Sequence, residues 1–288
     1  MPARVALVCD SSVCLPREIV DEYALHVVPM ELSLKGKTYL DGVDISPQEF
    51  YSLLAQCEEL PTTSAPSPAS FIKAYTEGAA HAESVLCLTL LSTVSTTYHV
   101  ALVAAEMARE ALPKAHIEVM DTHTAAGGQG LVVLAAARAA ARDATLPQVK
   151  AEAQRVMQGV SLIAFLDTLQ YLSRGGRIPR IAAWAGSALK LKPMMELSQG
   201  EIRPLERPRT RRRATERLLA IVHERVGNGA IRANVMHALA LDDAQALKER
   251  LLSEFNCVEA LVSEFTPVMG THTGPGLVGI AFHREESP

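Results

Sequence analysis

Four polar stretches interrupt an otherwise aliphatic chain, and their side chains suit the holding of an anion better than the breaking of a bond. They lie at residues 62–68, 91–98, 173–178 and 270–276. Together they carry hydroxyls, arginines, glycines and a histidine, with no paired carboxylates and no set of metal ligands. Hydroxyl, imidazole and guanidinium groups all donate hydrogen bonds to carboxylate or phosphate oxygens. The four stretches therefore indicate a site for an anionic head group rather than a hydrolase.

The first two stretches each precede a predicted helix. Thr63 and Ser64 come just before a helix that begins near residue 67, and Ser95 and Thr96 lie at the start of a longer one. Free backbone N–H groups and the helix dipole favour an anion at such a position. The alternative is that these hydroxyls only cap the helices or face solvent, which is the commoner role for each stretch taken alone.

The other two stretches combine charge or imidazole with flexible backbone. Arg174 and Arg177 flank two glycines, so guanidinium groups can grip a carboxylate or phosphate while the backbone approaches closely. His272 and Thr273 lie in a segment with three glycines and a proline, which predicts a loop that holds the histidine. The alternatives are a surface turn with solvated arginines and a histidine with a structural role.

The sequence disfavours several classes of function. It has no P-loop, no Gly-x-Ser-x-Gly and no His-Glu-x-x-His motif. Asp121 lies beside hydroxyls at a predicted strand end, where a carboxylate more often holds a loop in place than catalyses. Residues 207–213 contain five arginines, but the net charge is −4 and no aromatic residue is interleaved for base stacking. A solvated helix start or a docking patch for an acidic partner is preferred to a nucleic-acid site.

Composition indicates a reduced intracellular protein with an aliphatic core. The chain has 288 residues, of which 48% are hydrophobic and 5% aromatic. Its five cysteines form no Cys-x-x-Cys pair, and an odd number favours free thiols in a reducing compartment. No signal-peptide pattern precedes the first predicted strand, and no apolar run reaches the roughly 18–20 residues of a membrane helix. We therefore expect a cytoplasmic protein.

The first 160 residues predict alternating strands and helices. Strands are expected at residues 4–10, 26–34, 85–90 and 117–121, with a short returning strand at 38–40, and helices at 15–24, 46–57, 67–80, 95–112, 127–142 and 146–159. This alternation is typical of a parallel sheet covered by helices on both faces. Ligands bind outside the carboxyl ends of such strands, so the polar segments after residues 10, 90 and 121 should converge there.

The rest of the chain predicts a different architecture. Strands are expected at residues 161–167, 193–197, 202–206, 233–239, 258–265 and 277–283, and helices at 210–226 and 242–254, the latter capped by Asp242. Hairpins with fewer crossovers favour a mixed, mostly antiparallel sheet with helices on one face. The expected fold class is α/β, with a parallel-sheet α/β/α domain at residues 1–160 and a C-terminal α/β domain at residues 161–288.

Seven short motifs follow one another along the whole chain. They are Asp10-Ser11-Ser12, Pro29 with Asp41-Gly42, Thr63-Ser64-Ala65-Pro66-Ser67, Asp121-Thr122 with Gly128 and Gly130, residues 172–178, Lys192-Pro193 with Arg209-Thr210-Arg211, and His272-Thr273-Gly274-Pro275-Gly276. In this order they resemble the motifs of the DegV family of bacterial fatty-acid-binding proteins, and the order makes the resemblance far more specific than any one motif.

Two positions depart from the family pattern. Thr96 stands where the family has glycine in Leu-Ser-Gly-Thr-Tyr, and Ala65 stands where it has glutamine. Neither departure removes Ser95. Thr96, however, adds a side chain beside the expected carboxylate position, so the shape of that site is expected to differ from the family pattern.

The resemblance implies a two-domain protein that holds one long-chain fatty acid, such as palmitate or oleate, in a buried tunnel between its domains. It implies no metal, no cofactor and no catalysis by the chain itself. A separate ATP-dependent fatty acid kinase, similar to dihydroxyacetone kinases, would convert the bound acid to an acyl phosphate for phospholipid synthesis, with transient membrane contact. The implied ligand contacts are Thr63, Ser64, Ser95, Thr96, His272, Thr273 and Arg177, and the implied kinase contacts are Arg209 and Arg174.

Two rival hypotheses stay open at this point. The chain can be a stand-alone acyl or phosphoryl transferase that uses His272 and a serine. It can also be a regulatory nucleic-acid binder that uses the arginines of residues 207–213, although its acidic net charge of −4 argues against this.

Overall fold

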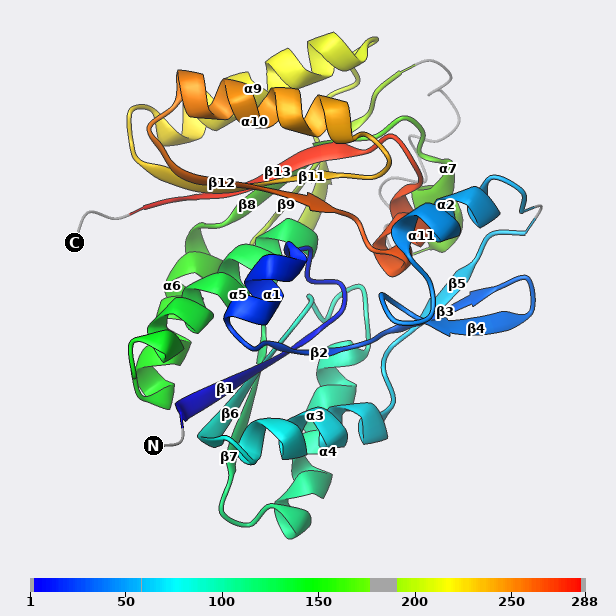
Figure 1. Ribbon diagram of the computed structural model, residues 1–288. Helices are drawn as coiled ribbons and strands as arrows, with labels where there is room; N and C mark the ends of the chain where they lie inside the picture. The colour runs from blue at the N-terminus through cyan, green and yellow to red at the C-terminus, as the bar shows by residue number, and fades with distance from the viewer. Residues whose placement is uncertain (1–2, 58, 177–190, 286–288) are drawn as a thin grey trace.

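The parallel sheet predicted for the first half of the chain is present. The computed structural model describes residues 3–57, 59–176 and 191–285 (Figure 1). Within these residues four parallel strands have the order β2-β1-β6-β7. They are β1 (Ala3–Asp10), β2 (His26–Val28), β6 (Ala82–Thr89) and β7 (His116–Asp121). Because β1 and β6 become buried on both faces, they are continuous apolar runs rather than alternating ones.

Helices cover both faces of this sheet, as the sequence predicts. Helices α3 (Pro68–Ala79) and α4 (Thr97–Ala111) lie on one face, and α5 (Ala126–Ala141) and α6 (Leu146–Gly159) lie on the other. This half of the chain also contains α1 (Arg17–Glu22) and α2 (Pro47–Leu54). Val8 and Cys87 on one face share a core with α3 and α4. Leu7 and Leu86 on the other face belong to the core that includes α5 and α6. The predicted start of α2 is confirmed, since Ser46 and the glutamate three residues later form a capping box.

The second large sheet is mixed and mostly antiparallel, which confirms the predicted fold class. Its order is β10-β9-β8-β13-β11-β12, and only the β11–β12 pair in it is parallel. Two helices, α9 and α10, share a core with one face of this sheet. The elements are β8 (Ser161–Phe165), β9 (Met194–Ser198), β10 (Glu201–Pro204), α9 (Arg211–Val226), β11 (Ile231–His237), α10 (Leu241–Glu254), β12 (Cys257–Glu264) and β13 (Val278–Arg284).

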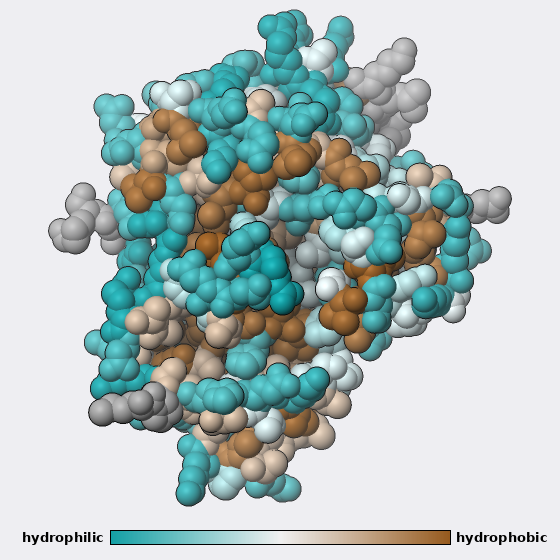
Figure 2. Space-filling model, in the orientation of Figure 1, coloured by the Kyte–Doolittle hydropathy of each residue, from teal (hydrophilic) through white to brown (hydrophobic). Residues whose placement is uncertain are grey.

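Helix α5 lies between the two large sheets and touches both of them (Figure 1). It contacts β1 of the parallel sheet and β11 and β13 of the mixed sheet, and most of its residues are buried. A helix that is apolar on every side is stable only when it is covered on every side. In Figure 2, accordingly, the outer helices present mostly hydrophilic residues, while apolar residues show between the upper and lower halves.

A third, small sheet was not anticipated. The sequence predicts one strand over residues 26–34, but the strand is interrupted at Pro29. The residues before it form β2 of the parallel sheet, and the residues after it form β3. Proline lacks the N–H that a continuous ladder needs. The small sheet has the order β4-β3-β5, with the expected hairpin turn at Lys35-Gly36. Its strands are β3 (Glu31–Leu34), β4 (Lys37–Leu40) and β5 (Thr62–Ser64).

Three further details differ from the sequence-based prediction. The predicted loop around His272 is wrong, because α11 (Pro267–Thr273) is a helix that starts with a first-turn proline and ends at Gly274 with φ +71°. A short helix, α7 (Gln170–Gly175), occupies part of the predicted arginine-glycine turn. Asp242 does not cap α10. Ala240 is the N-cap residue, and Asp242 lies in the first turn, where a carboxylate interacts favourably with the positive end of the helix dipole.

We predict that a methyl group at Gly279 destabilises the fold. Gly279 of β13 pairs with Ala164 of β8, and an added Cβ would lie 2.7 Å from the Ala164 Cβ and 2.9 Å from the Ile163 carbonyl oxygen. Overpacking of this kind lowers the free energy of unfolding by about 2 kcal/mol. Urea unfolding of Gly279→Ala measures this loss.

The matched control is Gly159→Ala at the end of α6, where an added Cβ meets no atom within 4 Å. This variant should be neutral or more stable by about 0.5 kcal/mol, since alanine restricts the unfolded chain. Equal unfolding midpoints for the two variants would contradict the tight approach of β13 to β8.

Candidate functional site

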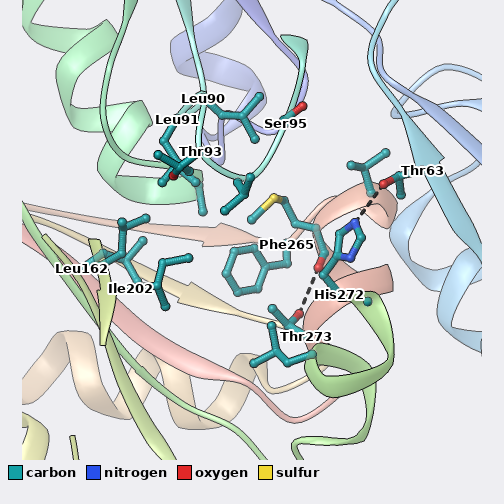
Figure 3. Close-up of a pocket in the computed structure, with 18 of the residues that line it drawn as sticks. Thr63, Leu90, Leu91, Thr93, Ser95, Leu162, Ile202, Phe265, His272 and Thr273 are labelled. Carbon is teal, nitrogen blue, oxygen red and sulfur yellow. Dashed lines mark hydrogen bonds between the residues drawn. The ribbon is translucent and has the colours of Figure 1, made fainter. Parts of the chain in front are cut away.

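A cavity of about 610 Å³ opens beyond the amino end of α5, with walls from both halves of the chain (Figure 3). One wall comes from the polar segment after β6, as the convergence argument predicts, and from β5. Further lining residues come from β8, β9, β10 and α11. Because these segments are far apart in the sequence, the cavity exists only when both large sheets are in place.

The polar end of the cavity is organised around Thr63 and His272. The Thr63 Oγ1 atom of β5 lies 2.8 Å from the His272 Nε2 atom of α11, and both residues are half-buried. Figure 3 shows the two side chains pointing toward each other. A hydroxyl and an imidazole nitrogen can each donate to an anion or to each other, depending on the histidine tautomer. The pair therefore offers a polar contact point at one end of an otherwise apolar space.

Other predicted head-group residues lie on the same cavity. Ser95 is half-buried at the amino end of α4, where its Oγ accepts the Thr97 N–H at 3.2 Å and lies 2.8 Å from the Thr97 Oγ1. Thr273 donates from its Oγ1 to the Met269 carbonyl oxygen at 3.1 Å. Six of the seven predicted ligand contacts thus line the cavity, and they are Thr63, Ser64, Ser95, Thr96, His272 and Thr273.

The two predicted arginines within the described residues, Arg174 and Arg209, are not brought into this group. Arg177 lies outside the described residues. Arg174 on α7 and Arg209 before α9 are exposed, and neither is among the described residues that line the cavity. Arg211 has a structural role, because its guanidinium donates to an Asp167 carboxylate oxygen and to the Gly276 carbonyl oxygen, each at 2.7 Å. Part of the arginine cluster thus ties the start of α9 to neighbouring loops.

Two glycines let α7 and α11 approach each other, a role that the sequence did not reveal. A Cβ at Gly175 would lie 3.2 Å from the His272 Nδ1 atom, and one at Gly274 would lie 2.2 Å from the Tyr171 ring. The helices α7 and α11 therefore approach each other through two residues that lack side chains. Glycine at both positions lets α7 pack against the end of α11 that carries His272.

Most of the other residues that line the cavity are apolar. In Figure 3 Leu162 and Ile202 lie at the end opposite to His272, with Phe265 between the two ends. Sequence reasoning missed these residues, because apolar side chains that face a cavity follow the same alternating pattern as those that face a filled core. The apolar lining residues include Leu90, Leu91, Leu162, Leu166, Leu172, Met195, Leu197, Ile202, Phe265, Val268 and Leu277.

Buried carboxylates hold the loops that form the polar end. Asp10 is fully buried, and its Oδ2 accepts the Leu90 N–H at 2.8 Å and the Gln129 Nε2 at 3.1 Å. Burial raises the pKa of Asp10, and these hydrogen bonds oppose the rise. Asp121 accepts the Ser92 N–H at 3.0 Å and the His123 N–H at 2.8 Å. The prediction that Asp121 holds its loop in place is confirmed.

The arrangement suits the binding of an amphiphile. It offers hydroxyls and an imidazole at one end and an elongated apolar surface elsewhere. Among the described residues, no group of three or more histidine, cysteine, aspartate or glutamate side chains is placed to hold a metal ion. In the same part of the chain, no helix has the length and hydropathy needed to cross a membrane.

Comparison with known proteins agrees with the motif resemblance. Residues 4–285 match the family described as uncharacterised protein, DegV family. A DegV domain-containing protein of Streptomyces coelicolor is 36% identical over 282 residues, which cover 97% of this chain and 98% of that protein.

Solved structures agree as well. A fatty-acid-binding DegV family protein from Thermus thermophilus superposes with a TM-score of 0.89 at 33% identity, covering 98% of this chain and 100% of that one. DegV from Bacillus subtilis, a fatty acid binding protein, gives a TM-score of 0.85 at 27% identity, covering 98% and 100%. The full-length match confirms the resemblance found in the sequence, and the chain belongs to the DegV family.

Proposed function

We propose that this chain binds one long-chain fatty acid, such as palmitate or oleate, in the cavity. The observation that carries the proposal is the Thr63–His272 pair, 2.8 Å apart, at one end of an apolar cavity of about 610 Å³. The carboxylate would lie at this pair and at Ser95, with the acyl chain extending toward Leu162 and Ile202. Relatives with the same fold bind fatty acids, which supports this assignment.

The energetics favour a long acyl chain. Each buried methylene contributes about 0.8 kcal/mol, so about 14 methylenes contribute roughly 11 kcal/mol before the cost of association. A carboxylate buried without partners would cancel much of this gain. Hydroxyl donors at one end therefore fix the orientation of the ligand, and the apolar walls supply the affinity.

We further propose that the two halves, residues 1–160 and 161–288, act as two domains that enclose the ligand in a tunnel. The cavity takes lining residues from both halves, which supports this division. Separation of the halves would open the apolar walls to water. We therefore expect ligand exchange to require a relative movement of the two halves.

The polar end is where a second protein would act on the ligand. Ser64 and Thr96 line the cavity and are exposed, so this end is within reach of solvent. In this proposal a cytoplasmic, ATP-dependent fatty acid kinase transfers the γ-phosphoryl group of ATP to the bound carboxylate, which yields an acyl phosphate and ADP. The exposed Arg174 and Arg209 would face the acidic surface of that kinase. The chain itself acts as a carrier, and its acyl phosphate would feed phospholipid synthesis.

The first test is the ligand itself. Native mass spectrometry of protein purified from its own cells should show one bound fatty acid per chain, and solvent extraction should identify it. Protein that is recovered only without ligand, and that takes up neither added palmitate nor added oleate, would contradict the proposal.

The second test concerns the polar end. Ser95→Ala and His272→Ala should each raise the Kd for oleate by about tenfold, because a hydrogen bond to a charged group contributes about 1.5–3 kcal/mol. Both should also slow acyl-phosphate formation by the cognate kinase. Isothermal titration and a coupled ADP assay measure the two effects.

Ser67→Ala is the matched control for these variants. Ser67 caps α3, with its Oγ accepting the Ser70 N–H at 3.2 Å, and it does not line the cavity among the described residues. It should lower stability by about 1 kcal/mol without changing the Kd.

Turnover of acyl phosphate by the chain alone, without the kinase, would instead favour the stand-alone transferase.

A further inference from the structure

A buried aspartate connects the two elements that carry Thr63 and His272. Asp41 follows β4 and is 2% exposed. Its Oδ1 accepts the Val268 N–H at 3.1 Å, and its Oδ2 accepts the Ser11 hydroxyl at 2.6 Å. The same Ser11 Oγ accepts the Met30 N–H at 3.0 Å, and the Asp41 N–H donates to the Met30 carbonyl oxygen at 2.9 Å.

On one side of Asp41 these contacts lead to the histidine. Val268 is the second residue of α11, whose N-cap residue Thr266 makes no side-chain capping hydrogen bond. Asp41, 227 residues away in the sequence, accepts the free N–H instead. His272 lies four residues further along, which is about one turn, or about 6 Å along the helix axis. The carboxylate therefore fixes the amino end of α11, about one turn before His272.

On the other side the contacts lead to the threonine. Met30 directly precedes β3, and Leu32 of β3 pairs with Thr63 of β5. Asp41 holds Met30 both through its own N–H and through Ser11. The strand that positions Thr63 and the helix that positions His272 are thus anchored to a common side chain.

We propose that Asp41 is a positioning residue for the head-group site, whose carboxylate sets the 2.8 Å approach of Thr63 to His272. This inference rests on the fatty-acid-binding function proposed above. Asp41 itself does not line the cavity among the described residues, so it acts through α11 and β3 rather than on the ligand. An ionised carboxylate grips the Val268 N–H more strongly than a neutral group, because charge-assisted hydrogen bonds are about twice as strong.

The charge on Asp41 changes within an accessible pH range. Burial raises its pKa from 3.8 to about 6, and hydrogen bonds from Ser11 and Val268 oppose the rise. Lowering the pH through 6 therefore protonates Asp41 in the folded protein and weakens its hold on α11. The titratable groups around it are Asp10, Cys14 and Tyr51, and burial raises the pKa of each. Cys14 and Tyr51 are uncharged from pH 5.0 to pH 7.5, because burial moves their pKa values further above an ordinary value that is already alkaline.

The test compares two substitutions of Asp41 by the ratio of each variant's Kd for oleate to that of the wild type, at two pH values. Asp41→Asn keeps an acceptor oxygen for Val268 without the charge, and Asp41→Ala removes both. We expect the Kd for oleate, measured by titration, to be about threefold above wild type for Asp41→Asn at pH 7.5 and equal to wild type at pH 5.0, because the wild type is then protonated as well. Asp41→Ala should be about tenfold weaker than wild type at pH 7.5, with Asp41→Asn recovering most of the loss.

Thr210→Ala is the control for a stability loss alone. Thr210 caps α9 through the Arg213 N–H at 3.2 Å and has no part in the cavity walls that the structure describes. It should lower the Tm with an unchanged Kd at both pH values. A Kd ratio for Asp41→Asn that is the same at pH 7.5 and pH 5.0 would overturn the proposal, and so would wild-type affinity in Asp41→Ala. If Asp41→Ala fails to fold, Ser11→Ala replaces it and should weaken binding in the same direction.

A measurement on ligand-free protein tests the role of Asp41 even if the proposed fatty-acid-binding function is wrong. If the wild type takes up no oleate at any pH, the fatty-acid assignment fails. The imidazole NMR signals of His272 still report on Asp41. They should differ between wild type and Asp41→Asn at pH 7.5 and coincide at pH 5.0. Identical His272 spectra at pH 7.5 would refute a positioning role for Asp41.

Discussion

The burial of α5 between two sheets is the constraint on which the rest of the structure depends. Most residues of this helix are small, apolar and buried, and it packs against the parallel sheet, the mixed sheet and α6. Small residues allow this close approach: the Gly127 N–H lies 3.0 Å from the Met236 sulfur, and a Cβ at Gly127 would lie 2.6 Å from it. The cavity begins where α5 begins, and Ala125 and Ala126 line it.

Beyond the amino end of α5, buried backbone N–H groups near the strand ends need hydrogen-bond partners, and side chains supply several of them. Asp10, Asp41 and Asp121 accept the N–H groups of these loops. Several hydrogen bonds to a buried carboxylate offset part of the cost of its burial, and burial still raises the pKa of Asp41 to about 6. The hydroxyls and the imidazole of the cavity owe their positions to these carboxylates, which do not themselves line it among the described residues.

The departure at Thr96 from the family pattern has a simple structural account. Thr96 has φ −80° and ψ 0°, a conformation open to any residue, so the position does not require glycine. Its side chain is exposed at the edge of the cavity rather than buried within it. Ala65 also lines the cavity, where a glutamine would place a longer, polar side chain. Both departures change the rim of the site and leave Thr63, Ser95 and His272 in place.

The sequence by itself determined most elements of the two large sheets and the edge at which polar segments meet, but it did not reveal β5, α7 or α11. Helix caps such as Ser46 and Ser67, and the apolar runs of buried strands, are local signals because they depend only on residues that are near in sequence. The contact of Thr63 with His272, 209 residues apart, and the capping of α11 by Asp41 were decided only by the tertiary structure. Local propensity carries no information about how two sheets pack around one helix, and that packing brings these residues together.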